Sequence, residues 1–336
     1  MHIDSLPKLR RHLQVALELE HSTIPPYLCA LYSIPDGVNA GASALIRSVV
    51  MEEMLHMVLV ANLLNAIGGM PSVDSPKFVP SYPTSLPHSD RSFEVHLLPF
   101  GTDAVDAFML IERPARPDAP PEGNRYHTIG QFYKALLDAF VHLVDRDGAD
   151  SIFCGDRRRQ VSAASAYYGG GGTPIEVYDL DSAKRAILEI AEQGEGFDET
   201  IFDGDNQFGE IDELAHYYRF REIRAGRRFL ATDTPHHDPT GAELLVDWTA
   251  RYPMAPNPRA RDYADQPEIH ALMTDFNRRY TTLLRTLHAV FNGAPARLVD
   301  AVPMMYDLKY RAQALMAIPT GRRDGLTVGP SFEYVA

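Results

Sequence analysis

The sequence contains the pattern Glu-x-x-His three times. This pattern is informative because residues three apart lie on the same face of a helix. The pairs are Glu18 with His21, Glu53 with His56, and Glu213 with His216. A carboxylate and an imidazole on one face can bind the same metal ion, and two such pairs can hold two ions. Because a single match arises readily by chance, the surrounding residues must decide which pairs bind metal.

Two of the three pairs lie on helix faces that are otherwise apolar. The first such stripe is Ile46, Val49, Val50, Glu53, His56, Met57, Val60 and Leu63, and the second is Glu213, His216, Phe220 and Ile223. An unpaired carboxylate on such a face would cost several kcal/mol or become protonated. We therefore predict that Glu53, His56, Glu213 and His216 are metal ligands. Glu18 and His21 share a face with Arg11 and Gln14, and we expect this face to be solvated.

Two further segments carry an inward-facing carboxylate. Glu20 lies on a stripe with Leu13, Leu17 and Ile24, and the segment AEQGEG offers both Glu192 and Glu195. Aligning LELEHST with LEIAEQGE pairs Glu20 with Glu192, which we prefer as the ligand. Glu195 then remains a second ligand or a carboxylate that moves with the redox state. Glu52, next to Glu53, is expected to support a ligand or to lie at the surface.

These residues predict a fold. One Glu from each of two helices, together with a Glu-x-x-His from each of two others, is the ligand set of the ferritin-like di-metal carboxylate bundles. We therefore predict a mainly α protein with a ferritin-like four-helix bundle. Its halves would span residues 6–68 and 181–230, with a long crossover insertion at 69–180 and a C-terminal helical extension at 260–336. All of these parts would form one domain, 1–336.

Hydrophobic periodicity and breaker residues locate the elements of this bundle. The stretch 70–128, rich in Pro and Ser, predicts loops with a few strands. Pro25 and Pro26 lie inside the first helix and release the carbonyls of His21 and Ser22. The resulting kink would either line a substrate cavity or bend the helix over the core. Helices are predicted at 6–32, 42–67, 128–144, from a cap at Asp181 or Ser182 through 193, and at 210–230, 267–292 and 296–317.

A carboxylate-rich site with two His ligands suits iron, or manganese, better than copper. Two such ions can bind O₂ and exchange electrons with an organic substrate. The first hypothesis is therefore a non-haem di-iron oxidase or oxygenase that acts on a small aromatic metabolite. Ferritin-type iron oxidation and storage is the alternative, and a metal-free helical bundle is the third interpretation. Arg113 and Arg125 could pair with a substrate carboxylate, and Tyr27, Tyr217 and Tyr218 could line its pocket, although structural roles are common for both residue types.

Composition excludes several partners. The formal charge of −13 argues against nucleic acid and anionic membranes. The sequence has no run of about 18 apolar residues and no apolar core typical of a signal peptide near its start. We therefore expect a cytoplasmic protein. A small homo-oligomer is expected if the protein is an enzyme of this kind, and a very large shell if it stores iron. Cys29 and Cys154 offer no disulfide network.

Several longer segments resemble one family. These are STIPPYLCALYSI, VVMEEMLHMVLVANLLNAIGGMP, TIGQFYKAL, EQGEG, DELAHYYRFREI and GPSFEY. Together they resemble the ferritin-like iminophenyl-pyruvate dimer synthases, which are related to the chromopyrrolic-acid-type enzymes of the violacein and rebeccamycin pathways. The resemblance implies a ferritin-like bundle and the oxidative coupling of two aryl 2-imino acid molecules made by an amino acid oxidase. The violacein-type enzymes are much longer, and their extra regions are absent here.

Overall fold

A computed structural model describes residues 3–336, apart from 117, 166–170, 197–199 and 205–212. The described part is mainly helical, and its extended segments pair only as isolated bridges such as Thr84 with Val95. The α-helices are α1 Leu6–Ser33, α2 Ala40–Ala66, α3 Thr102–Ile111, α4 Ile129–Asp147, α5 Ala149–Ile152, α6 Leu180–Glu195, α7 His216–Ala225, α8 Pro267–Phe291 and α9 Leu298–Met316.

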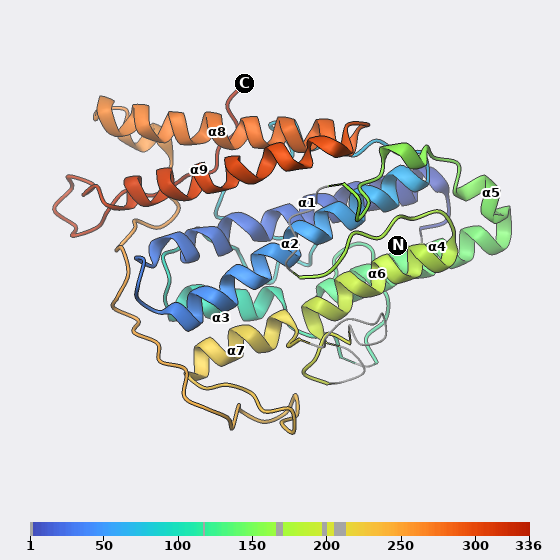
Figure 1. The fold of residues 1–336 in the computed structure, drawn as a ribbon, viewed down its shortest axis with the longest axis horizontal. Coiled ribbons are helices and arrows are strands. Elements are labelled where there is room, and N and C mark those ends of the chain that lie inside the picture. Colours follow the sequence, from blue (N-terminus) through green and yellow to red (C-terminus); the bar gives the residue numbers. More distant parts are fainter. Residues whose placement is uncertain (1–2, 117, 166–170, 197–199, 205–212) are drawn as a thin grey trace.

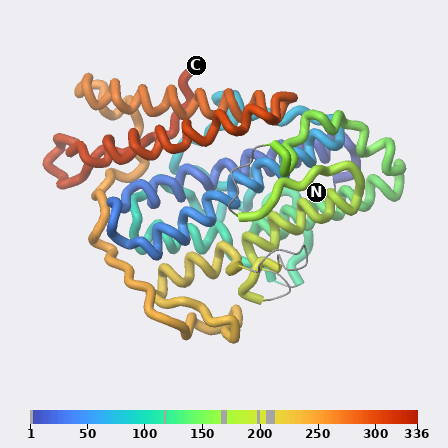
Figure 2. The backbone as a smooth tube through the Cα atoms, viewed as in Figure 1, coloured from blue at the N-terminus to red at the C-terminus, as the bar shows by residue number. Residues whose placement is uncertain are grey.

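The helices form three layers (Figure 1). The central layer is the antiparallel pair α1 and α2, which are joined by the short connection 34–39. On one side α4 packs with α6 and α3 packs with α7, and these pairs meet the central pair. On the other side α8 and α9 lie across it (Figure 2). Because α2 has neighbours on both sides, it is apolar around most of its circumference.

The predicted helices are largely observed, with three differences. Helix α3 lies within the stretch predicted to be loops and strands. Helix α6 is capped by Asp179 rather than by Asp181 or Ser182: the Asp179 side chain accepts from the Ser182 N–H, forming a capping box. Helix α7 begins only at His216, so Glu213 precedes it. Residues 210–212 of the predicted helix lie outside the described residues.

Helix α1 continues through Pro25 and Pro26 to Ser33. The carbonyl of Ser22, which loses its helical donor at Pro26, accepts a hydrogen bond from the Tyr82 hydroxyl at 2.8 Å. Both residues are buried. The released carbonyl of Ser22 is therefore satisfied by the crossover segment.

The face of α1 that was expected to be a solvated edge is solvated only in part: Arg11 is exposed, Gln14 and Glu18 are half-buried, and His21 is buried. His21 is 3 % exposed, lies against Phe78, and its Nε2 is 2.5 Å from the hydroxyl of Tyr280 in α8. The periodicity of α1 alone could not show this, because the covering helix comes from the far end of the chain. His21 is thus part of the packing between layers.

Candidate metal centre

Two groups of acidic and histidine side chains meet where α1 and α2 face α3, α6 and α7. One group is Glu20, Glu53 and His56, and the other is Glu53, Glu112 and His216. Within each group the potential ligand atoms lie within 4.8 Å of one another, and all of these residues are buried. Glu53 belongs to both groups. The arrangement therefore offers two adjacent metal positions with one carboxylate between them.

The two histidines face each other across the cluster. Their rings stack with centroids 5.5 Å apart. The Nδ1 of His56 is 3.1 Å from Glu20 Oε2 and 3.8 Å from Glu53 Oε1. The Nδ1 of His216 is 3.1 Å from Glu53 Oε1 and 3.6 Å from Glu112 Oε2. Both rings thus present Nδ1 to Glu53, the carboxylate that the two groups share.

The opposite nitrogen of each ring is held by a fixed partner. His56 Nε2 is 2.9 Å from the side-chain oxygen of Gln193 in α6, and His216 Nε2 is 2.8 Å from Glu52. Such partners keep the proton on Nε2 and leave the Nδ1 lone pair available to a metal ion. Glu52, which was expected to support a ligand or lie at the surface, has the supporting role.

Glu52 is held in turn by Arg219, at 2.6 Å. Burial alone would raise the pKa of Glu52, but Arg219 and His216 outweigh burial and lower the pKa to about 2. Glu52 is therefore an anion at neutral pH. It increases the basicity of His216 without adding uncompensated charge.

Hydroxyl groups orient the remaining carboxylates. Thr23 donates to Glu53 Oε2 at 2.6 Å. Tyr133 donates to Glu20, and Tyr27 donates to Glu112. Tyr27 is thus a structural partner of the cluster, whereas the sequence left open whether it lines a substrate pocket.

The charge balance favours a bound cation. Burial and the nearby carboxylates of Glu112 and Glu20 raise the pKa of Glu53 to about 7. Burial disfavours the charged form of His216, but Glu112, Glu52 and Glu53 together raise its pKa well above the usual value. The Nδ1 of His216 is buried and makes no hydrogen bond of good geometry. An imidazole nitrogen and several acidic oxygens that converge in this way are a donor set that suits a divalent cation.

The structure does not bring every predicted ligand to this cluster. Glu213 is exposed and pairs with Arg219 at 3.1 Å. Because the backbone is not helical before His216, the three-residue spacing does not place Glu213 beside it. The carboxylate of Glu213 contacts Arg219, which in turn contacts Glu52, the partner of His216.

Glu192 and Glu195, the two candidates in α6, also lie outside the two groups. Glu192 is half-buried, and Gln193 rather than Glu192 meets His56. Glu195 lines a small cavity beside Glu20 and Glu53, and its carboxylate accepts from the Ala115 N–H at 2.7 Å. Burial raises the pKa of Glu195 to about 7. Arg113 lines the same cavity, so one of the two arginines considered for substrate binding lies near the cluster.

Glu112 is the cluster residue that sequence reasoning missed. It follows the last residue of α3, and its hydrogen bond from Tyr27 ties that end of α3 to α1. A signal existed, because Val105, Phe108 and Ile111 form an apolar helical stripe that Glu112 continues. The Pro-rich surroundings concealed this short helix.

Residues 13–225 match the Ferritin-like family. The chain belongs to this family. The match covers the central pair and the layer that carries the cluster, so the predicted ferritin-like fold is confirmed. A crystal structure of a ferritin-like protein from Caulobacter vibrioides has the same fold, with a TM-score of 0.69, 23 % identity and full coverage of both chains.

Two curated relatives confirm the resemblance seen in the sequence. The chain is 26 % identical to a dichlorochromopyrrolate synthase from Lentzea aerocolonigenes, over 98 % of this chain and 36 % of the relative. It is also 26 % identical to a 2-imino-3-(indol-3-yl)propanoate dimerase from Chromobacterium violaceum, over 98 % of this chain and 34 % of the relative. The chain thus spans about a third of the length of these relatives.

No helix in the described ranges combines the length and the apolar character that crossing a bilayer requires.

Proposed function

We propose that this ferritin-like protein is a di-metal oxidoreductase, with iron as the preferred metal and manganese as the alternative. The observation that carries the proposal is the pair of ligand groups that share Glu53. Glu20, Glu53 and His56 would hold one ion, and Glu53, Glu112 and His216 the other. When bound, such a pair supplies reversible one-electron redox steps and a binding place for O₂.

The protein's own side chains would prepare this chemistry. Gln193 and Glu52 fix the two imidazoles, while Thr23 and two tyrosines fix the carboxylates. The cavity beside Glu20 has a volume of only about 20 Å³, which admits a molecule the size of water or O₂. In this conformation an aromatic substrate would have to bind at the mouth of the cavity, where Arg113 is exposed and can pair with a carboxylate.

The substrate class follows from the relatives. We propose that two aryl 2-imino acid molecules are coupled through a new C–C bond. Each molecule loses one hydrogen, and O₂ takes up the two electrons and two protons as hydrogen peroxide. The name of the Chromobacterium violaceum relative, a dimerase of an indolyl 2-imino acid, supports this substrate class. An amino acid oxidase would supply the imino acid.

The test is product formation by the iron-loaded protein. A 2-imino acid made in place from tryptophan or phenylalanine should give a coupled product detectable by mass spectrometry. The Glu53→Ala variant should give no coupled product above the uncatalysed background. Iron-dependent O₂ uptake that continues without any organic substrate, in a protein that sediments as a large shell, would instead favour ferritin-type storage.

The ligand set has its own test, because sequence and structure choose different carboxylates. Glu112→Gln should lower the metal content from two ions per chain to about one, since it removes a ligand of one position. Glu213→Gln is the matched control and should retain both ions. Metal analysis after iron-replete expression distinguishes the two assignments, and loss of metal in the control alone would favour Glu213.

A further inference from the structure

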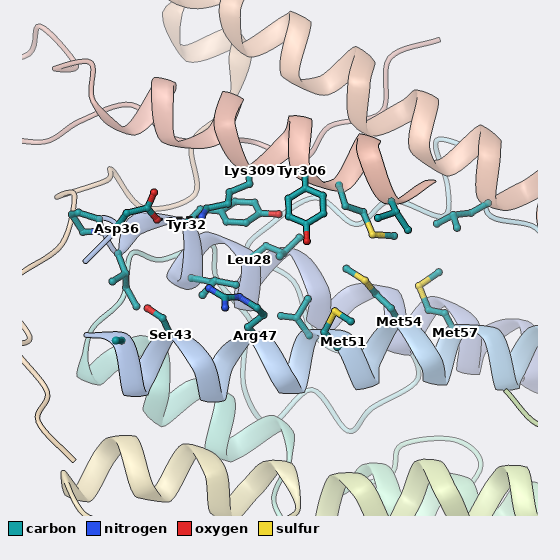
Figure 3. A pocket seen from close by; sticks show the side chains of 18 of the residues that line it. Leu28, Tyr32, Asp36, Ser43, Arg47, Met51, Met54, Met57, Tyr306 and Lys309 are labelled. Carbon is teal, nitrogen blue, oxygen red and sulfur yellow. Dashed lines mark hydrogen bonds and ion pairs between the residues drawn. The ribbon is translucent and has the colours of Figure 1, made fainter. Parts of the chain in front are cut away.

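A second cavity lies on the opposite side of α1 and α2 from the metal cluster, where α9 and the end of α8 pack over them. It is an open groove of about 360 Å³, within the size range of sites that bind small organic ligands. Figure 3 shows its lining side chains, which come mainly from α1, α2 and α9. Helix α9 packs on α8 and α1, which leaves the groove between α9 and α2.

One end of the groove is apolar. Met51, Met54 and Met57 follow one stripe of α2, with Leu28 of α1 beside them (Figure 3). Met305 of α9 also lines the groove. Methionine side chains are flexible and polarizable, so they adapt to aromatic as well as alkyl groups. This end can therefore hold the apolar body of a ligand without selecting one shape.

The other end carries positive charge. Arg47 lies on the same stripe of α2 as the methionines. Within the described ranges, its guanidinium forms no hydrogen bond or ion pair with a side chain or carbonyl. Lys309 of α9 is also present, but its ammonium pairs with Asp36 at 3.2 Å. Two cations and one carboxylate leave a net charge of +1 at this end, in a chain whose formal charge is −13.

We propose that this groove binds an amphipathic organic monoanion, with its apolar body along the α2 methionines and its carboxylate on Arg47. A guanidinium can form two parallel hydrogen bonds to a carboxylate, which fixes the orientation of the ligand. Fatty acids and aryl carboxylates share this chemistry. The site is separated from the metal cluster by α2 itself, so the proposal does not depend on the proposed oxidation.

Calorimetric titration of the full chain with decanoate and with indole-3-acetate tests the proposal. It also distinguishes a fatty acid from an aryl carboxylate as the preferred ligand. We expect one molecule of at least one of these anions to bind per chain. Decylamine, which has the same apolar body and the opposite charge, should not bind. Arg47→Gln should weaken anion binding by about tenfold, the effect of losing one charge-assisted pair.

Two variants make the test specific to the groove. Met54→Trp should block binding by filling the apolar end, whereas Arg278→Gln, an exposed arginine on α8, should leave binding unchanged. The proposal is overturned if neither anion binds below about 1 mM, if decylamine binds as well as decanoate, or if Arg47→Gln binds as tightly as the unaltered chain. A dimer that dissociates in Met54→Trp would also overturn it, because the groove would then be an interface between copies.

Discussion

At the scale of single residues, the two proposed metal positions differ in what holds their histidines. His56 is supported by the neutral amide of Gln193, whereas His216 is supported by the anion of Glu52. A carboxylate partner makes an imidazole a stronger ligand than an amide does. The position built on His216 should therefore bind its ion more tightly than the position built on His56.

Gln193→Met tests this difference. It keeps the size of the side chain but removes the oxygen that orients His56, so the affinity of the weaker position should fall by roughly 10- to 100-fold. Competitive metal titration with a chelator measures both affinities. Glu192→Gln on the same helix is the control, with unchanged affinities. Equal losses at the two positions would show that Gln193 acts through the fold as a whole.

The sequence identified the cluster residues whose positions depend on local helix geometry alone. Glu53 and His56 lie within one continuous helix, so their spacing determines that they share a face. Glu213 and His216 have the same spacing, but α7 begins at His216 and the rule does not apply across a helix start. Glu112 enters the cluster from a separate short helix, and only the tertiary packing of α3 against α1 and α7 brings it there.

At the scale of elements, one of the two prolines inside α1, Pro26, is compensated by a partner outside the helix. Pro26 releases the carbonyl of Ser22, and Tyr82 of the crossover segment donates to it. The adjacent Thr23 joins Glu20 to Glu53, because its hydroxyl contacts the Glu20 carbonyl at 2.7 Å and the Glu53 carboxylate at 2.6 Å. The crossover is thus attached to α1 beside Glu20, one of the proposed metal ligands.

A double-mutant cycle measures this attachment. Tyr82→Phe should lower the free energy of unfolding by about 1–3 kcal/mol, because the buried Ser22 carbonyl loses its donor. In the Pro26→Ala background the same change should cost less, since the restored backbone N–H can donate to that carbonyl. Denaturant unfolding gives the coupling energy. Equal costs in both backgrounds would mean that the proline has no role in the contact.

The burial of His21 shows what helix periodicity cannot predict. Its face of α1 carries Arg11, Gln14 and Glu18, which favoured a solvated edge. Helix α8 nevertheless covers this face at His21, where Tyr280 contacts the imidazole, whereas Arg11 stays exposed. The sequence predicts a C-terminal helical extension at 260–336. It does not predict which face of α1 this extension covers, because that contact depends on the packing of the whole chain.

At the scale of the molecule, metal binding and folding should be linked. The three clustered carboxylates and two histidines come from four different helices or their ends, so bound cations would hold the central layer to the layer of α3 and α7. The same carboxylates repel one another without cations, as the raised pKa of Glu53 indicates. A ligand that binds only the folded state raises its stability.

Thermal unfolding with and without Fe(II) or Mn(II) measures this linkage. At about 100 times the dissociation constant, the midpoint should rise by roughly 5 °C, and a chelator should reverse the rise. Glu53→Ala should show no response, because it removes the carboxylate common to both positions. An equal rise in that variant would place the binding elsewhere. We also expect size-exclusion chromatography to give a monomer or small oligomer rather than a shell.

The central claim is that two ions lie side by side on Glu53. Anomalous diffraction at the iron edge, from crystals of the iron-loaded protein, tests it most directly. We predict two peaks, one among Glu20, Glu53 and His56 and the other among Glu53, Glu112 and His216. A single peak, or no iron at these residues in protein shown to contain two ions per chain, would contradict the account.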